Sequence, residues 1–191
     1  MSSIAELERS LGTSAVLVGG ASLLAVLLLA VHGLRRVGAH RTADVVAATA
    51  LLVAVAGVVL VTLGPQLRDG EVLPRRLILD PVLGATDGHG RTVWRPLVAN
   101  VSLFVPVGAL AAARFPGRRV QVWIAAVGLS LGVEATQYLL PIGRIANSAD
   151  VLANAGGAAL GVLLDRLVAT VTGSGRLPRH ARSEVGRQRL G

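Results

Sequence analysis

Acidic and amide side chains interrupt the apolar second half of this chain. Glu134 and Gln137 stand three residues apart and Asp150 and Asn154 four apart, so each pair shares one helix face, and Asn100 lies in the preceding apolar run. Polar groups are costly inside a membrane segment, and an intramembrane carboxylate marks a candidate functional site. These residue types predict a site that binds a polar ligand, acts as a general base or relays a proton.

Arg144 lies in the short connection between the two polar helices. It could contact an anionic group of a ligand, or it could pair with Glu134 or Asp150 and only fasten the connection. Buried amides can likewise hold helices together without binding anything. The residues alone leave both the ligand site and the purely structural role open.

The region from about residue 97 to residue 166 resembles the VanZ-like family of bacterial membrane proteins. The resemblance rests on an ordered set of motifs: Asn100-x5-Pro106-x-Gly108, Glu134-x-x-Gln137, Arg144, and Asp150-x-x-x-Asn154-x-x-Gly157-x-x-x-Gly161. It implies a small polytopic envelope protein whose namesake is linked to low-level resistance to teicoplanin, a lipoglycopeptide, and it brings no established enzymatic mechanism. By position, the counterparts of the family's polar motif are Asn100, Glu134, Gln137, Arg144, Asp150 and Asn154. The stretch Ile145-Ala146-Asn147 is less acidic than the resemblance leads us to expect.

Five apolar runs must position these side chains. A hydrocarbon core of about 30 Å requires roughly 20 residues of helix, at a rise of 1.5 Å per residue. The runs that approach this length are 14–34, 45–63, 97–113, 120–140 and 149–169. The chain is therefore predicted to be all-α, a polytopic transmembrane bundle of about five helices.

The organisation that follows has four parts. Residues 1–63 form two N-terminal transmembrane helices, and residues 64–96, with both signs of charge and four of the eight prolines, form an extracytoplasmic loop. Residues 97–169 form the VanZ-like three-helix core. Residues 170–191 are expected to be a disordered basic cytoplasmic tail.

The arginines predict the orientation. Twelve fall on the side that holds the C-terminus and seven on the other, and all the basic residues are arginine. Positive charge accumulates on the cytoplasmic side, so we expect the N-terminus outside and the C-terminus inside. This orientation brings the polar side chains of the last three helices toward the outer leaflet. Asp165 and Arg166 are then expected near the cytoplasmic headgroups.

Composition narrows the class of protein. The chain is 52% hydrophobic with a mean hydropathy of +0.63, which favours a multi-pass protein of the bacterial cytoplasmic membrane. The net charge of +8 is explained by topology-setting arginines, so nucleic-acid binding is not expected. The absence of cysteine excludes disulfides and thiolate metal sites.

The leading functional hypothesis is that the outer cluster binds a headgroup, that of a lipid-linked cell-wall intermediate or a glycopeptide, and so affects teicoplanin susceptibility. One alternative is a hydrolase or transferase that acts on a lipid-linked substrate with Glu134 or Asp150 as general base. Another is a small proton- or cation-coupled transporter. Membrane lipids are the expected surroundings, neither a cofactor nor a metal is expected, and the oligomeric state is open.

Small residues predict close helix packing. Gly128-x-x-x-Gly132 lies in the fourth apolar run and Gly157-x-x-x-Gly161 in the fifth. Glycines at this spacing let two helix backbones approach each other. Both pairs are therefore expected to pack helices of this chain together.

Overall fold

The computed structural model describes residues 2–64, 67–68, 71–72, 76–86, 93–140 and 145–174. Among these, the side chains of residues 2–17, 67–68, 71–72 and 76 are not described. Within the described part, five helices are long and apolar enough to cross a membrane, which confirms an all-α polytopic bundle. They are α1 (Ser2–Arg36), α2 (His40–Leu63), α4 (Trp94–Arg114), α5 (Arg119–Leu139) and α6 (Ser148–Val171).

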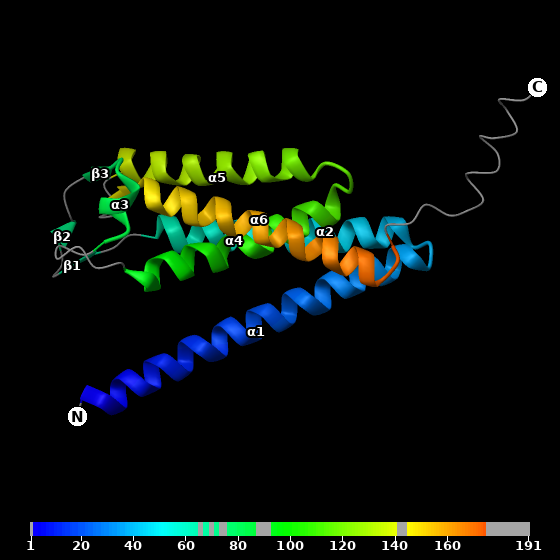
Figure 1. Cartoon of the computed structure of the whole chain (residues 1–191), viewed down its shortest axis with the longest axis horizontal. Helices are drawn as coiled ribbons and strands as arrows, with labels where there is room; N and C mark the ends of the chain where they lie inside the picture. Colours follow the sequence, from blue (N-terminus) through cyan, green and yellow to red (C-terminus); the bar gives the residue numbers. More distant parts are fainter. Residues whose placement is uncertain are drawn as a thin grey trace, which may run out of the picture.

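The helices run back and forth along one axis (Figure 1). Two sharp turns, between α1 and α2 and between α4 and α5, lie at the same end of the bundle. Each turn contains a glycine with positive φ, Gly38 at 85° and Gly117 at 84°, a conformation that other residues rarely adopt. The far ends of α2 and α5 and the first turns of α4 and α6 therefore meet at the opposite end.

The closest helix pair is α4 with α6, whose backbones touch through glycines. A Cβ atom on Gly157 would lie 3.0 Å from both Cα and C of Val101, and one on Gly161 would lie 2.6 Å from the amide nitrogen of Ala109. Gly108 on α4 faces the backbone of Ala158 in the same way. The expected packing role of Gly157 and Gly161 is thus confirmed.

The same expectation is wrong for Gly128 and Gly132 on α5. Nothing lies within 4 Å of the position that a Cβ atom would occupy at either glycine, among the residues that the structure describes. The spacing is the same as on α6, but this face of α5 points away from the other helices. A glycine pair marks a face where close approach is possible, and only the surrounding helices determine whether it occurs.

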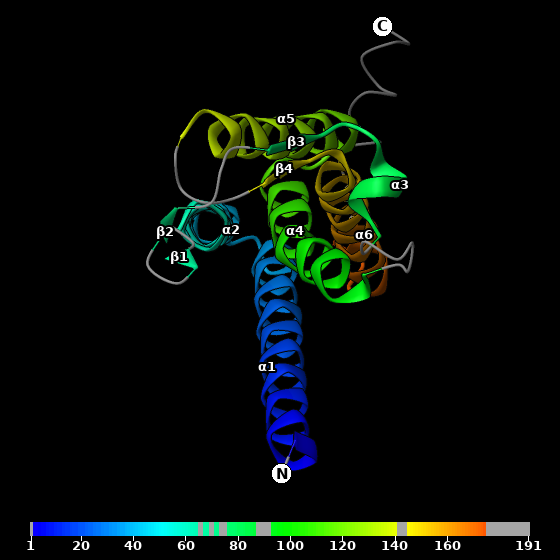
Figure 2. The same ribbon diagram turned by 90° about the vertical axis from the view of Figure 1, so that its left-hand side faces the viewer.

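The first helix is only partly integrated into the bundle. Its C-terminal part packs Leu24, Leu28 and Val31 against α2 and α4, while its N-terminal part diverges from the other helices (Figures 1 and 2). Large apolar side chains remain exposed on both α1 and α2, for example Leu29 and Leu52. A contiguous apolar exterior of this kind suits contact with lipid.

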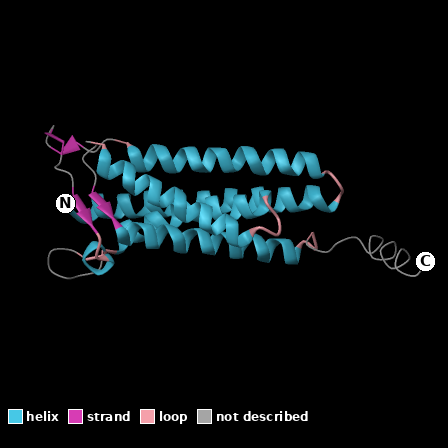
Figure 3. Ribbon diagram, turned by 90° about the horizontal axis from the view of Figure 1, so that it is seen from above, coloured by secondary structure: helices cyan, strands magenta, loops and turns pink. Residues whose placement is uncertain are grey.

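A small structured cap covers the end where α4 and α6 begin. Its parts are β3 (Arg76–Ile78), the short helix α3 (Pro81–Gly84) and β4 (Ile145–Asn147), with β3 parallel to β4 (Figure 3). Residues between the fourth and fifth expected helices thus form a strand that pairs with the long loop. The loop also contains the antiparallel pair β1 (Leu67–Arg68) and β2 (Glu71–Val72).

Candidate functional site

Glu134 connects the end of α5 to the cap. The side chain is 9% exposed, and its Oε2 accepts a hydrogen bond from the backbone N–H of Asn147 at 2.6 Å. A carboxylate that accepts from an amide makes a stronger bond than a neutral acceptor does. Glu134 therefore holds the start of α6 and the adjoining strand β4 close to α5.

Asn147 and Ser148 fasten the cap to the bundle. The side-chain amide of Asn147 donates to the carbonyl of Gly84 at 2.9 Å, and its Oδ1 accepts from the N–H of Ala149, which caps α6. The hydroxyl of Ser148 donates to the carbonyl of Leu79 at 2.8 Å. Because Gly84 has no side chain, the Asn147 amide can reach its backbone. The stretch Ile145–Asn147, less acidic than the family resemblance led us to expect, is thus the strand β4 of the cap.

Asp150 lies in the first turn of α6 and is partly exposed. It follows by three residues Asn147, whose backbone amide donates to Glu134. Negative charge is favoured at this end of a helix. Glu134 and Asp150 thus lie at the same end of the bundle, on the neighbouring helices α5 and α6.

Asn154 and Ser130 form a buried contact one turn deeper. The Asn154 amide donates to Ser130 Oγ at 2.8 Å, and the two residues are 2% and 0% exposed. The Oδ1 atom of Asn154 is also buried, and it has no hydrogen-bond partner among the described residues. This pair joins α5 to α6, and it leaves one acceptor that a water or ligand donor could satisfy.

Gln137 has a structural contact that the sequence did not indicate. Its side-chain amide donates to the carbonyl of Thr62 in the last turn of α2, at 2.9 Å, and the residue is 5% exposed. Gln137 thus binds α2 to α5 across 75 residues of sequence. Asn100 lies half-buried near the start of α4, at the same end of the bundle. Arg144 lies outside the described residues.

A second polar cluster, at the opposite end, was missed by the sequence analysis. His32 Nε2 lies 2.8 Å from Asp165 Oδ1, and His32 Nδ1 lies 2.7 Å from Ser174 Oγ. Arg119 approaches the other oxygen of Asp165 at 3.8 Å. Asp165 was expected near the cytoplasmic headgroups, and the structure buries its side chain against His32 of α1 and close to Arg119 of α5. The available signal was that His32 and Asp165 both lie near the ends of apolar runs predicted to finish on the same side.

No group of three or more His, Cys, Asp and Glu side chains in the described ranges is close enough to hold a metal ion. Four of the six predicted site residues lie on α5 and α6 near the capped end. Glu134 contacts the residue before α6, Asp150 lies in the first turn of α6, and Asn154 joins α6 to α5. Gln137 lies one turn along α5 from Glu134 and contacts α2.

Comparison with known proteins is consistent with this architecture. The family model described as VanZ/LLP1 matches residues 50–169, which extends from the middle of α2 through the cap to the end of α6. No curated protein and no solved structure matches the chain. The matched region begins well before residue 97. It therefore includes the second half of α2 and the cap as well as the three helices that carry the polar motif. Because the match covers more than half of the chain, this multi-pass membrane protein belongs to the VanZ/LLP1 family.

Proposed function

We propose that this protein, a VanZ-type protein of the bacterial cytoplasmic membrane, binds a polar headgroup at its capped end and thereby affects susceptibility to teicoplanin-type glycopeptides. The ligand is the headgroup of a lipid-linked cell-wall intermediate or a lipidated glycopeptide. The proposal includes the orientation that the arginines predict, with the capped end at the outer surface.

The observation that supports the proposal is the buried carboxylate of Glu134 in contact with the cap, with a second acid, Asp150, in the first turn of the next helix. Glu134 is nine-tenths buried on α5, and Asp150 lies in the first turn of α6, three residues after the amide that donates to Glu134. Removal of a carboxylate from water is costly, so a buried acid at the end of a membrane bundle is a candidate ligand contact. Two acids at the capped end of the bundle are suited to a ligand rich in hydrogen-bond donors.

The chemistry of the two ligand classes fits this acceptor set. Sugars, amines and peptide amides all present N–H or O–H groups, and carboxylates accept from them in charge-assisted bonds. Asn154 adds an amide oxygen one turn deeper, without a partner in the described part of the chain. Arg144, just before the cap strand β4, would supply the positive charge for an anionic group such as a phosphate.

The test is to express the wild-type chain, Glu134→Gln and Asp150→Asn in a teicoplanin-susceptible bacterium and to measure the inhibitory concentration of teicoplanin. Glutamine keeps an oxygen that can accept from Asn147, so Glu134→Gln retains the contact of the cap and removes the charge. We expect the wild-type chain to change the inhibitory concentration and both variants to abolish the change at equal membrane abundance.

Asp44→Asn provides a matched control. Asp44 is an acid at the opposite end of the bundle, paired with Arg35 at 2.8 Å and partly exposed, so the same change of charge is made far from the cap. It should behave as the wild type does. A wild-type response from both Glu134→Gln and Asp150→Asn would reject the headgroup site, and a wild-type chain without effect would reject the link to glycopeptides.

The acid pair also favours a second candidate, a membrane hydrolase or transferase in which Glu134 or Asp150 acts as general base. The two candidates differ in turnover. Purified protein that converts a lipid-linked substrate, with conversion lost in Glu134→Gln, would favour the enzyme, whereas saturable binding without conversion favours the headgroup site.

A further inference from the structure

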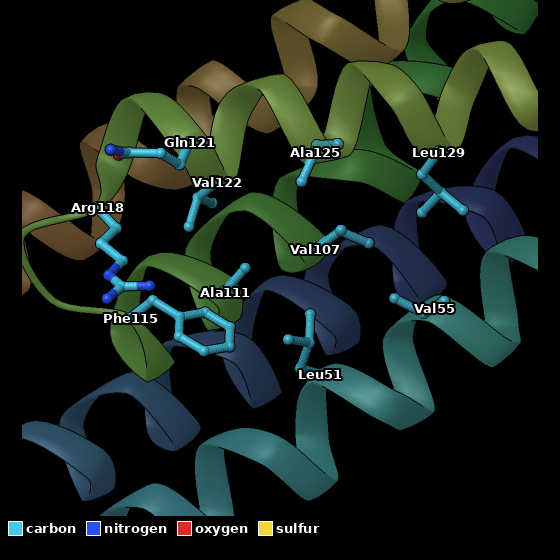
Figure 4. A pocket seen from close by; sticks show the side chains of 11 residues that line it. Leu51, Val55, Val107, Ala111, Phe115, Arg118, Gln121, Val122, Ala125 and Leu129 are labelled. Atoms are coloured by element: carbon cyan, nitrogen blue, oxygen red, sulfur yellow. The ribbon is translucent and has the colours of Figure 1, made fainter.

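An apolar groove runs along the outside of the bundle at the end opposite the cap. Its cavity volume is about 340 Å³, and it lies between α2, α4 and α5 (Figure 4). Val107, Val122 and Ala126 form a buried floor, and Leu51 and Val55 line the α2 side. A groove with an apolar floor that opens toward the surroundings of a membrane bundle is suited to a hydrocarbon chain.

The polar residues of the groove are gathered at one end. Arg118 lies beside Phe115 and Gln121 lies on α5 at the same end of the groove, while Leu129 and Val55 lie at the other end (Figure 4). Arg118 is the residue before the first turn of α5, at the sharp turn that follows α4. This end corresponds to the expected level of the lipid headgroups, and the apolar end lies toward the middle of the bilayer.

Arg118 differs from the other two arginines of this turn. Arg114 stacks over the ring of Phe115 at 5.0 Å, and Arg119 approaches the carboxylate of Asp165 at 3.8 Å. Within the described residues Arg118 has neither contact, and its side chain is exposed. The cation at the mouth of the groove is therefore free to pair with a phosphate.

The length of the groove matches one leaflet. From Arg118 to Leu129 the helix α5 rises by about 16 Å, at 1.5 Å per residue. Half of a hydrocarbon core of about 30 Å is about 15 Å. An acyl chain whose headgroup lies at Arg118 would thus end where the groove ends.

We propose that this groove is a specific site for an anionic phospholipid, with one acyl chain along α5 and the phosphate at Arg118 and Gln121. The charge at the mouth selects anionic over zwitterionic headgroups, because each cation near an anionic lipid adds a favourable electrostatic contribution. The site lies at the far end of the molecule from Glu134, so it is separate from the proposed headgroup site under the cap.

The test is native mass spectrometry of the full chain released from detergent after titration with phosphatidylglycerol or phosphatidylcholine. We expect the wild type to retain one phosphatidylglycerol more tightly than phosphatidylcholine. Arg118→Gln should weaken the retention of phosphatidylglycerol about fivefold, the effect of one charge near an anionic headgroup, and should remove the preference. Ala125→Phe, at an exposed position of the lining, should reduce the retention of both lipids by filling the groove.

Arg36→Gln is the matched control, because Arg36 is exposed at the same end of the bundle on α1 and does not line the groove. It should retain the lipid preference of the wild type. Equal retention of the two lipids by the wild type, or an unchanged preference in Arg118→Gln, would overturn the proposal. A dimer that excludes lipid and dissociates in Ala125→Phe would also overturn it, since a second copy of the chain would then occupy the groove.

Discussion

Gly161 on α6 lies against the backbone of α4, and we expect its replacement by alanine to destabilise the bundle. The new Cβ atom would be 2.6 Å from the amide nitrogen of Ala109 and would also press on the carbonyl of Val105. These are backbone atoms, so no side-chain rotation can relieve the contact. Raising the distance from 2.6 Å to 3.4 Å, where ordinary contact begins, requires α4 and α6 to separate by at least 0.8 Å.

The cost follows from the contacts that such a separation weakens. A gap of 0.5–1 Å removes roughly a quarter to a half of the attraction of each atom pair, which is about 0.1–0.2 kcal/mol. If the affected surface equals that of one buried leucine, roughly 40–60 pairs, the mid-range loss is about 3 kcal/mol, between limits of about 1 and 6 kcal/mol. Alanine returns at most about 1 kcal/mol through its higher helix propensity. The net loss of about 2 kcal/mol corresponds to a fall in Tm of about 4–8 °C.

The assay heats the detergent-solubilised protein to a series of temperatures and measures the fraction that remains monodisperse at each one, which gives Tm. Gly128→Ala is the matched control, because nothing lies within 4 Å of its Cβ position among the described residues. It should leave Tm unchanged or slightly higher. A Gly161→Ala protein as stable as the wild type would refute the close α4–α6 contact, and a strongly destabilised Gly128→Ala protein would show that α5 packs against something on its open face.

Two further predictions concern the end of the bundle opposite the cap. Asp165→Ala leaves a buried nitrogen of His32 without its partner and should lower the free energy of unfolding by about 1–3 kcal/mol. Asp165→Asn keeps a hydrogen-bonding group and should lower it by less. The same heating assay compares the two variants, and equal Tm values would contradict the buried pair. At fusion sites after Arg118 and at the C-terminus, a reporter enzyme that works only in the cytoplasm should be active, and one that works only in the periplasm should be inactive. Activity of the periplasmic reporter at either site would contradict the predicted orientation.

The number and type of the main elements could be predicted from sequence because they depend on local properties. An apolar run of about 20 residues must cross a membrane as a helix, since only a helix satisfies its own backbone there. Helical periodicity also placed Glu134 with Gln137, and Asp150 with Asn154, on common faces. The helix ends were less certain: α2 begins at His40 rather than near residue 45, because its first turn is polar yet still helical.

The contacts between distant segments could not be predicted in this way. Local spacing does not state which residue a side chain meets across the bundle, so Gln137 gave no indication of the Thr62 carbonyl, nor Glu134 of the Asn147 amide. The parallel pairing of β3 with β4 was also invisible, because strands of three residues have no clear periodicity.

The sequence by itself determined that this chain is a membrane bundle and that Glu134 with Gln137, and Asp150 with Asn154, share helix faces, because hydropathy and helical spacing act over a few residues at a time. Only the tertiary structure decided which of two equal glycine pairs would be buried, and that Asp165 would be buried in a pair with His32 across 133 residues. The reason is that burial is a property of neighbouring helices, whose arrangement minimises unpaired polar groups over the whole chain.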